Sequence, residues 1–295
     1  WSYSGFAVHF RGTALRATLT NTMAFYFVVL LDGQLIRRFE TQPGTGSYTL
    51  ASGLPDAEHV LEVHRDTEGQ YGTSTLLGFS GGMILPPPLG PERLIEIIGD
   101  SVSCGYGNLA VEHHQPELHD GCRYSFLTES AFASYGAIAA RSLGADLSIV
   151  ATSGWGVSRG KDHTRQKTIS RVYERALADQ PRPAWEFRRE PALVVVNLGA
   201  NDVTPPAPDP GEAQFLSSYR RLLQTVRSHY PHAWIICAVS SSLSDDYPPD
   251  IHARSLIRGW TLGLVRERAA QGDQRISHLE FPYADVSGQL GSARS

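Results

Sequence analysis

The chain has 295 residues, of which 41% are hydrophobic and 19% are charged, and its formal net charge is -4. These values are typical of a globular protein with enough residues for two modest domains or one large one. They give no electrostatic basis for binding nucleic acid or an anionic membrane, and apolar runs such as residues 24–31 are too short to span a bilayer.

The first 80 residues show short β-type runs separated by turn signals and no convincing helical pattern. Asp32-Gly33 lies between two such runs and predicts a hairpin, because a type I′ turn needs positive φ angles. Many short strands with turn signals favour a β-sandwich or jelly roll, which we expect in residues 1–85. The expected strands are residues 7–10, 15–20, 25–31, 35–39, 48–50, 59–64 and 75–79.

A proline-rich segment at residues 86–91 predicts a connector between domains, because proline fixes φ and lacks an amide donor. From residue 92 to residue 295, apolar runs alternate with helical patterns, which predicts a flavodoxin-like α/β domain: a five-stranded parallel sheet with helices on both faces. The expected strands are residues 94–98, 146–151, 193–196, 234–239 and 275–281, and the expected helices are residues 129–143, 166–178, 212–229 and 252–270.

Three successive strands of this domain end beside residues suited to acyl transfer. Ser101 follows the first strand, Gly154 the second and Asn201 the third, and function gathers at the carboxyl ends of strands in open α/β sheets. A serine hydroxyl is a nucleophile, while a glycine amide, an asparagine side chain and the amide of Ser101 are donors for an oxyanion hole. Taken alone, Asp100-Ser101 also fits an ordinary helix N-cap.

The same positions resemble a known family. Gly99-Asp100-Ser101, Gly154 and residues 199–202 (GAND) resemble the first three sequence blocks of the SGNH, or GDSL-type, hydrolases. Residues 98–108 (IGDSVSCGYGN), 135–141 (YGAIAAR) and 153–156 (SGWG) are similar to carbohydrate esterase family 2, and the resemblance covers essentially the whole chain.

This resemblance implies an N-terminal jelly roll, Ser101 as the nucleophile, and Gly154 with Asn201 in the oxyanion hole. It also implies that the substrate is a carbohydrate carrying O-acetyl groups, such as acetylated xylan, and that neither a metal nor an organic cofactor is needed. Trp155 stands where the family often has a lysine, so we expect it to stack on sugar or to form the wall of the site. An ordinary half-buried aromatic is the equally weighted alternative.

The resemblance places the catalytic histidine near the C-terminus, in a segment like Asp-Trp-His-Pro before a closing helix. Residues 285–295 (DVSGQLGSARS) hold no such histidine, and a serine hydroxyl without a base is a weak nucleophile. Either the histidine lies beyond Ser295 or the protein has lost its base. We expect the former, because a domain without its last helix leaves an apolar sheet face exposed.

Other histidines are less suited to this role. On the loops nearest the expected site lie His113, His114, His119 and His163. We expect a structural role for His278, and we expect His229 and His232, which flank Pro231 at a turn, to lie away from the site. Asp100 and Asp202 are expected to cap or brace their loops rather than to orient a histidine.

The three cysteines are too few for a fold built on disulfides. Cys104 and Cys122 flank one loop and form a candidate bridge, although spacing does not decide the pairing. Cys237 lies in an apolar strand and is expected in the core, and no Cys/His spacing resembles a zinc site.

The leading hypothesis is therefore a serine esterase that deacetylates carbohydrate. The alternatives are a carbohydrate-binding protein on a catalytically impaired scaffold, and an SGNH lipase or thioesterase. The chain starts at Trp1 rather than Met, and we expect a secreted or periplasmic protein whose N-terminus has been processed. Oligomeric state and the particular polysaccharide are not predicted.

Overall fold

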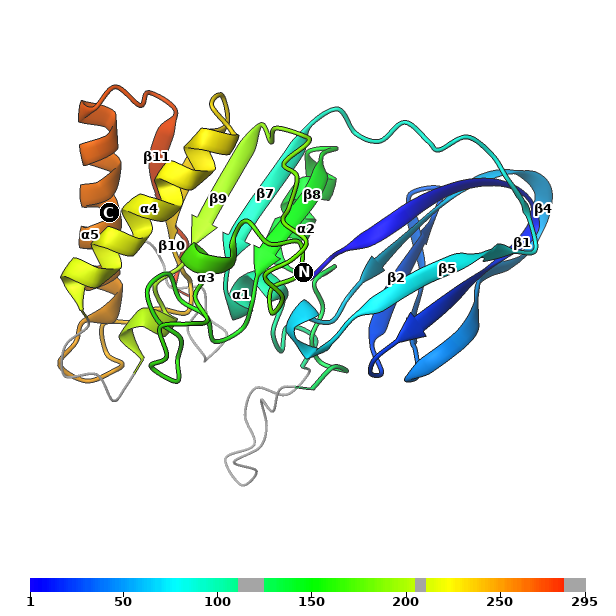
Figure 1. The fold of residues 1–295 in the computed structure, drawn as a ribbon, viewed down its shortest axis with the longest axis horizontal. Coiled ribbons are helices and arrows are strands. Elements are labelled where there is room, and N and C mark those ends of the chain that lie inside the picture. Colours follow the sequence, from blue (N-terminus) through cyan, green and yellow to red (C-terminus); the bar gives the residue numbers. More distant parts are fainter. Residues whose placement is uncertain (111–124, 205–210, 284–295) are drawn as a thin grey trace.

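The computed structural model describes residues 1–110, 125–204 and 211–283. These residues form two β-sheets that lie side by side, one antiparallel and one parallel (Figure 1). The fold class predicted from the sequence is confirmed: a β domain precedes a five-stranded parallel sheet covered by helices. Within the described part of the chain, no helix is long and apolar enough to cross a membrane.

The N-terminal sheet has the strand order β3-β2-β4-β1-β5, and β6 pairs with β1. Its strands are β1 (Gly5–Asn21), β2 (Tyr26–Leu31), β3 (Gln34–Glu40), β4 (Gly44–Arg65), β5 (Ser74–Ser80) and β6 (Met83–Ile84). A short 3-10 helix, η1 (Gly69–Tyr71), follows β4. The buried core of this domain consists largely of Phe10, Leu15, Leu19, Phe25, Leu50, Leu61 and Val63.

Two long strands replace pairs of short strands expected from the sequence. Residues 7–10 and 15–20 belong to the single strand β1, and residues 48–50 and 59–64 both belong to β4. The β1–β4 register shifts between Gly12 and Ala14, so the ladder bends there without stopping. The expected turn at Asp32-Gly33 joins β2 to β3, and both residues have positive φ, 49° and 80°, as a type I′ turn requires.

The parallel sheet has the order β11-β10-β9-β7-β8. Its strands are β7 (Leu94–Gly99), β8 (Asp146–Ala151), β9 (Leu193–Asn197), β10 (Trp234–Val239) and β11 (Ile276–Glu280). The described helices are α1 (Ser101–Cys104), α2 (Tyr135–Ser142), α3 (Ile169–Val172), η2 (Asn201–Val203), α4 (Glu212–His229) and α5 (Ala253–Ala270).

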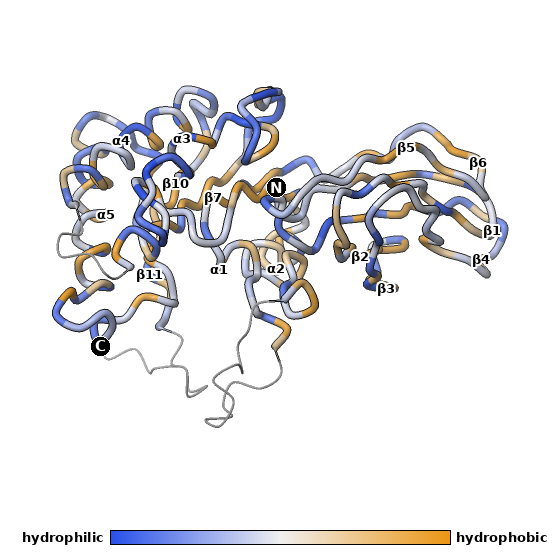
Figure 2. The backbone as a smooth tube through the Cα atoms, turned by 60° about the horizontal axis from the view of Figure 1, so that its bottom comes forward, coloured by the Kyte–Doolittle hydropathy of each residue, from blue (hydrophilic) through white to orange (hydrophobic). Residues whose placement is uncertain are grey.

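Helices pack on both faces of this sheet because its strands are apolar on both sides. Side chains of α1 and α2 share one core cluster with Ile95 and Ile97, whereas α3, α4 and α5 share another with Ile98 and Val196. Gly136 of α2 lies so close to β7 that a Cβ there would meet Ile97 at 2.7 Å. Figure 2 shows the hydrophobic colouring along β7 where it runs between these helices.

Two helices are shorter than the sequence pattern predicts. The helix expected at residues 129–143 begins only at Tyr135, where the side chain of Ser134 caps it. The helix expected at residues 166–178 is reduced to α3, and Tyr173, which follows α3, donates its hydroxyl to the buried Glu96 at 2.6 Å.

A buried polar network joins the two sheets. Arg38 Nε of β3 donates to Asp66 Oδ2 at 2.6 Å, and its guanidinium also donates to the carbonyl of Glu129 at 2.7 Å. Asp66 Oδ1 accepts bonds from Ser130 Oγ at 2.7 Å and from the amide of Phe132 at 2.9 Å. The end of β4 is thereby bonded to the segment before α2, while the domain boundaries near residues 85 and 92 stay a prediction.

Candidate active site

The strand order brings the three predicted site residues to one edge of the sheet. β7 lies between β8 and β9, and its last residue, Gly99, pairs with Ala151 and Asn197. Ser101, Gly154 and Asn201 therefore lie in the segments that follow the carboxyl ends of three adjacent strands, β7, β8 and β9. This is the place where open α/β sheets bind ligands.

Ser101 is the first residue of α1 and is half-buried. Asp100 is both the predicted cap and the residue that presents Ser101: its Oδ1 accepts the amide of Val102 at 3.2 Å. Within the described ranges, Ser101 Oγ has no hydrogen-bond partner, so its hydroxyl is available to a ligand. Gly99 makes the tight turn possible, since a Cβ there would lie 2.0 Å from Ser103 Oγ.

Gly154 lies in the loop after β8 with φ 82°, a left-handed conformation that suits glycine. Its carbonyl accepts the amide of Lys161 at 2.7 Å, so the carbonyl is occupied by the loop itself. No described group accepts its amide N–H. The amide of Gly154 is therefore a candidate oxyanion donor.

Asn201 begins η2 and links the other two strand ends. Its Nδ2 donates to Asp100 Oδ2 at 3.4 Å and to the carbonyl of Trp155 at 3.5 Å. Both hydrogen bonds are long and therefore weak, so the Asn201 amide can also donate to a bound ligand. Asn201 is therefore placed between the Ser101 loop and the Gly154 loop.

Asp100 is fully buried, and burial raises its pKa from 3.8 to about 7, with Asp202 and Glu68 adding to the rise. A carboxyl group with this pKa holds a proton over much of the acidic range. It therefore places less negative charge beside Ser101 than an exposed aspartate does.

Asp202 braces the loop opposite Asn201, as expected. Its buried carboxylate accepts the amides of Val157 at 2.9 Å and Ser158 at 2.8 Å, and the hydroxyl of Ser158 at 2.6 Å. Arg159 Nε donates back to the carbonyl of Asp202 at 2.6 Å. Because Asp202 follows Asn201 directly, these bonds fix the Asn201 turn against the Gly154 loop.

Sequence reasoning missed one site residue, Glu68, which comes from the β domain. Its carboxylate accepts the amide of Ser153 at 2.8 Å and also the hydroxyl of Ser153. Ser153 immediately precedes Gly154. The two residues are 85 positions apart in the chain, and no motif joins them, so only the structure could find this contact.

Three of the described histidines are bonded to residues other than Ser101. His278 Nε2 lies 3.0 Å from Thr261 Oγ1, His163 Nδ1 lies 3.0 Å from the Arg159 guanidinium, and His229 Nε2 lies 2.7 Å from Glu174. None of these three bonds involves Ser101, Gly154 or Asn201. The other candidates, His113, His114 and His119, and residues 284–295 fall outside the described residues.

Trp155 is buried, with 6% of its surface exposed, and it belongs to the core on the α4 side of the sheet. Lys167 Nζ lies 5.7 Å from its ring centroid. This burial fits a site wall better than a sugar platform, although a role in binding stays a prediction. Cys104 and Cys237 are both buried free thiols, and Cys122 lies outside the described residues.

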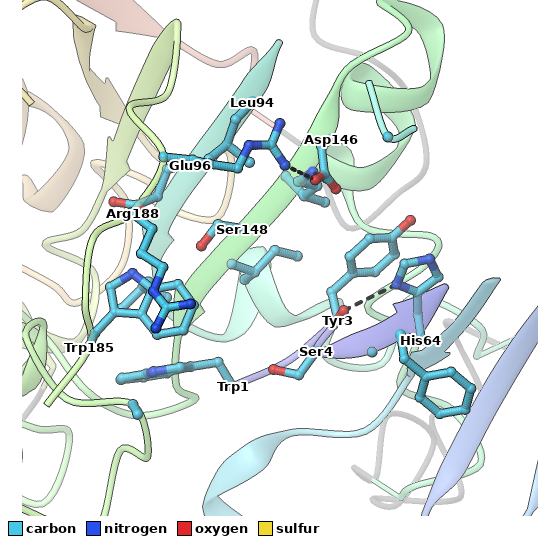
Figure 3. Close-up of a pocket in the computed structure, with 18 of the residues that line it drawn as sticks. Trp1, Tyr3, Ser4, His64, Leu94, Glu96, Asp146, Ser148, Trp185 and Arg188 are labelled. Carbon is cyan, nitrogen blue, oxygen red and sulfur yellow. Dashed lines mark hydrogen bonds and ion pairs between the residues drawn. The ribbon is translucent and has the colours of Figure 1, made fainter. Parts of the chain in front are cut away.

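A large cavity lies elsewhere, beside the amino-terminal halves of β7 and β8 (Figure 3). It has a volume of about 880 Å³, and Trp1, Glu96, Ser148, Trp185 and Arg188 are among the residues that line it. Ser101, Gly154 and Asn201 are not among them. The cavity is thus separate from the three strand ends, and the site for chemistry is assigned to those ends.

Comparisons with known proteins agree with this geometry. Residues 1–88 match the profile described as carbohydrate esterase 2 N-terminal, and residues 97–288 match that of the GDSL-like lipase/acylhydrolase family. The cellulase/esterase CelE of Acetivibrio thermocellus is 31% identical over 99% of this chain, which spans 34% of that protein. An acetylxylan esterase / glucomannan deacetylase of Cellvibrio japonicus is 30% identical over 64% of the chain and 51% of its own length.

Solved structures give the same result. The structure of a family two carbohydrate esterase from Clostridium thermocellum in complex with cellohexaose is 31% identical, with a TM-score of 0.87. The match covers 97% of this chain and 84% of that chain. The chain thus spans about a third to a half of the length of these two curated relatives but most of the solved esterase chain. It belongs to the GDSL-like lipase/acylhydrolase family and, within it, to carbohydrate esterase family 2.

Proposed function

We propose that the protein is a serine esterase that removes O-acetyl groups from carbohydrate through an acyl-enzyme on Ser101. The observation that carries the proposal is the placement of Ser101, Gly154 and Asn201 at three adjacent strand ends, with Asn201 in contact with both other loops. A nucleophile and donors from separate elements that converge on one point are what acyl transfer requires.

Each residue has a distinct task in this proposal. Ser101 Oγ attacks the acetyl carbonyl carbon, and the negative charge that forms on the carbonyl oxygen accepts hydrogen bonds from the amides of Ser101 and Gly154 and from Asn201 Nδ2. Collapse of the tetrahedral intermediate expels the sugar oxygen, which takes a proton. Water then hydrolyses the acetyl-Ser101 ester and releases acetate.

A histidine is the base that such a serine needs. No described histidine is bonded to Ser101, and the proposal therefore assigns the base to a residue outside the described ranges. That residue accepts the Ser101 proton and returns it to the sugar oxygen. Ser101, Gly154 and Asn201 supply the nucleophile and the stabilisation of the oxyanion.

The substrate class is supported by the names of the relatives. The Cellvibrio japonicus protein is an acetylxylan esterase / glucomannan deacetylase, and the Clostridium thermocellum structure holds cellohexaose. We propose an acetylated polysaccharide or oligosaccharide as the substrate, with no metal or organic cofactor. We also propose that the protein acts outside the cytoplasm, where such polymers occur.

Acetate release from acetylated xylan, acetylated glucomannan and 4-nitrophenyl acetate tests the proposal on the full natural chain. We expect release from all three and much slower hydrolysis of 4-nitrophenyl decanoate. A preference for the decanoate would show a lipase instead. No release from any ester would reject the esterase assignment.

Carbohydrate binding without hydrolysis is a second candidate. It is supported by the 31% identical esterase structure in complex with cellohexaose, together with the absence of a bond between Ser101 and any described histidine. Calorimetric titration with cellohexaose separates the two candidates: binding without acetate release from any acetylated polymer would favour this second function.

A further inference from the structure

A carboxylate of the β domain reaches the loop that carries Gly154. Glu68 lies three residues beyond the end of β4, is completely buried, and accepts the amide of Ser153 at 2.8 Å. It also accepts the hydroxyl of Ser153. A charge-assisted pair of bonds to one residue is among the stronger polar contacts that a protein makes.

Glu68 is itself held in place from several sides. Arg65 donates to its carbonyl at 2.7 Å, and Glu129 Oε2 accepts its amide at 3.2 Å. Gln70 Nε2 donates to Glu68 Oε2 at 2.7 Å, the same oxygen that accepts the amide of Ser153. A side chain fixed in this way can impose its position on the residue that it binds.

The bond to Ser153 bears directly on the Gly154 amide. The peptide plane between Ser153 and Gly154 contains that N–H, so its direction depends on ψ of Ser153 and on φ of Gly154, which is 82°. Anchoring the amide and the hydroxyl of Ser153 limits the freedom of this plane. Without the anchor, a loop whose glycine tolerates many conformations can turn its N–H away.

A second carboxylate holds the other side of the same loop. Asp202 accepts the amides of Val157 and Ser158, while Glu68 accepts that of Ser153. The loop is thus clamped between the β domain and the turn that carries Asn201. These bonds tie the loop that carries the Gly154 amide both to the β domain and to the turn that carries Asn201.

We propose that Glu68 is a positioning residue for the oxyanion hole, so that the β domain completes the active site of the hydrolase domain. The inference rests on the proposed function, because an oxyanion hole matters only if Ser101 performs acyl transfer. It assigns to the β domain a role in catalysis that does not require it to bind carbohydrate.

The test uses Glu68→Ala, Ser153→Ala and the control Ser130→Ala in the full natural chain. Ser130 Oγ also donates to a buried carboxylate of the β domain, Asp66, at 2.7 Å, but it is not part of the Gly154 loop. Ser130→Ala thus removes one bond of the same kind between the same domains.

Glu68→Ala is expected to lower kcat for 4-nitrophenyl acetate about 100-fold with KM little changed, because misplacing a catalytic group by about 1 Å costs that much. Ser153→Ala, which removes only the hydroxyl bond, is expected to lower kcat less. The double variant should lose no more kcat than Glu68→Ala, since Glu68→Ala already removes that bond. Glu68→Gln, which keeps one acceptor oxygen, should restore part of kcat. Ser130→Ala should lower stability and leave kcat unchanged.

Hydrogen exchange of residues 151–158 supplies a readout that does not depend on activity. We expect faster exchange in Glu68→Ala than in Ser130→Ala. Equal exchange and equal kcat in these two variants would overturn the inference. If the wild-type chain releases no acetate while Glu68→Ala still loosens this loop, the proposed function fails and the loop contact stands. Should Glu68→Ala not fold, Glu68→Gln and Ser153→Ala give the same comparison.

Discussion

Asn201 Nδ2 lies 3.4 Å from Asp100 Oδ2, so the first residue of η2, in the turn after β9, contacts the residue that presents Ser101. The same amide lies 3.5 Å from the carbonyl of Trp155, next to Gly154. One side chain therefore touches both the loop that follows β7 and the loop that follows β8. This makes Asn201 the residue through which the geometry of the three strand ends is most directly tested.

Asn201→Ala is expected to lower kcat for 4-nitrophenyl acetate by about 10²–10³-fold, the typical cost of removing one oxyanion-hole donor. KM should change little, because the donor is needed most when charge develops in the transition state. Steady-state kinetics measures both constants.

Gln214→Ala is the matched control. Gln214 lies in α4, and its Nε2 donates to the carbonyl of Ser158 at 3.2 Å. It therefore contacts the same loop with the same chemical group but does not contact Asp100 or Trp155. An equal fall in kcat for both variants would argue against a donor role for Asn201.

Gly154→Ala tests the second donor against Gly144→Ala. Both glycines have positive φ, 82° and 58°, so both substitutions should lower the free energy of unfolding by about 1–3 kcal/mol. A Cβ at Gly144, which follows α2, would have no atom within 4 Å, whereas a Cβ at Gly154 would lie 3.2 Å from Lys161.

Only Gly154→Ala is expected to lower kcat, because only there does backbone strain act on an amide of the site. Urea unfolding and steady-state kinetics of the two variants give the comparison. Similar loss of kcat in Gly144→Ala would mean that general destabilisation explains the effect.

Asp100 predicts a pH dependence of stability. Its pKa is about 7 in the folded chain, against 3.8 as the ordinary value, so the folded state binds a proton more tightly than the unfolded state. Stability from this group is fully present below pH 3.8 and is lost as the pH rises towards 7. Between these values the free energy of unfolding should fall by an amount on the order of a few kcal/mol.

Asp100→Asn removes this titration while keeping an oxygen that can accept the amide of Val102. Urea unfolding at intervals between about pH 4 and pH 7 should show a shallower fall for the variant than for the wild type. Parallel curves for the two proteins would contradict the raised pKa of Asp100. Asp202 and Glu96 also have raised pKa values, so the difference between the two curves is the quantity to compare.

The sequence was sufficient for the sheet and for the three strand ends, because apolar runs and the small residues after them are local signals. Ser101, Gly154 and Asn201 each follow a strand that hydrophobicity alone locates. The adjacency of those strands follows from the topology that alternating strands and helices favour.

Contacts between residues far apart in the chain could not be predicted from the sequence. Nothing local in Glu68 indicates that it binds Ser153, since the pair is joined only after two domains have packed. The same holds for the bond between Tyr173, which follows α3, and Glu96 of β7. The sequence pattern divides β1 and β4 because glycines resemble turn signals, although there they mark bends in continuous strands.

The most direct test of the central claim is acetate release by Ser101→Ala. The full natural chain with this substitution should release acetate from acetylated xylan at least about 10⁴-fold more slowly than the wild type, because the nucleophile is gone. The variant should retain the wild-type urea midpoint, since Ser101 Oγ bonds to no described group. Acetate release at the wild-type rate by a folded Ser101→Ala protein would contradict an acyl-enzyme on Ser101.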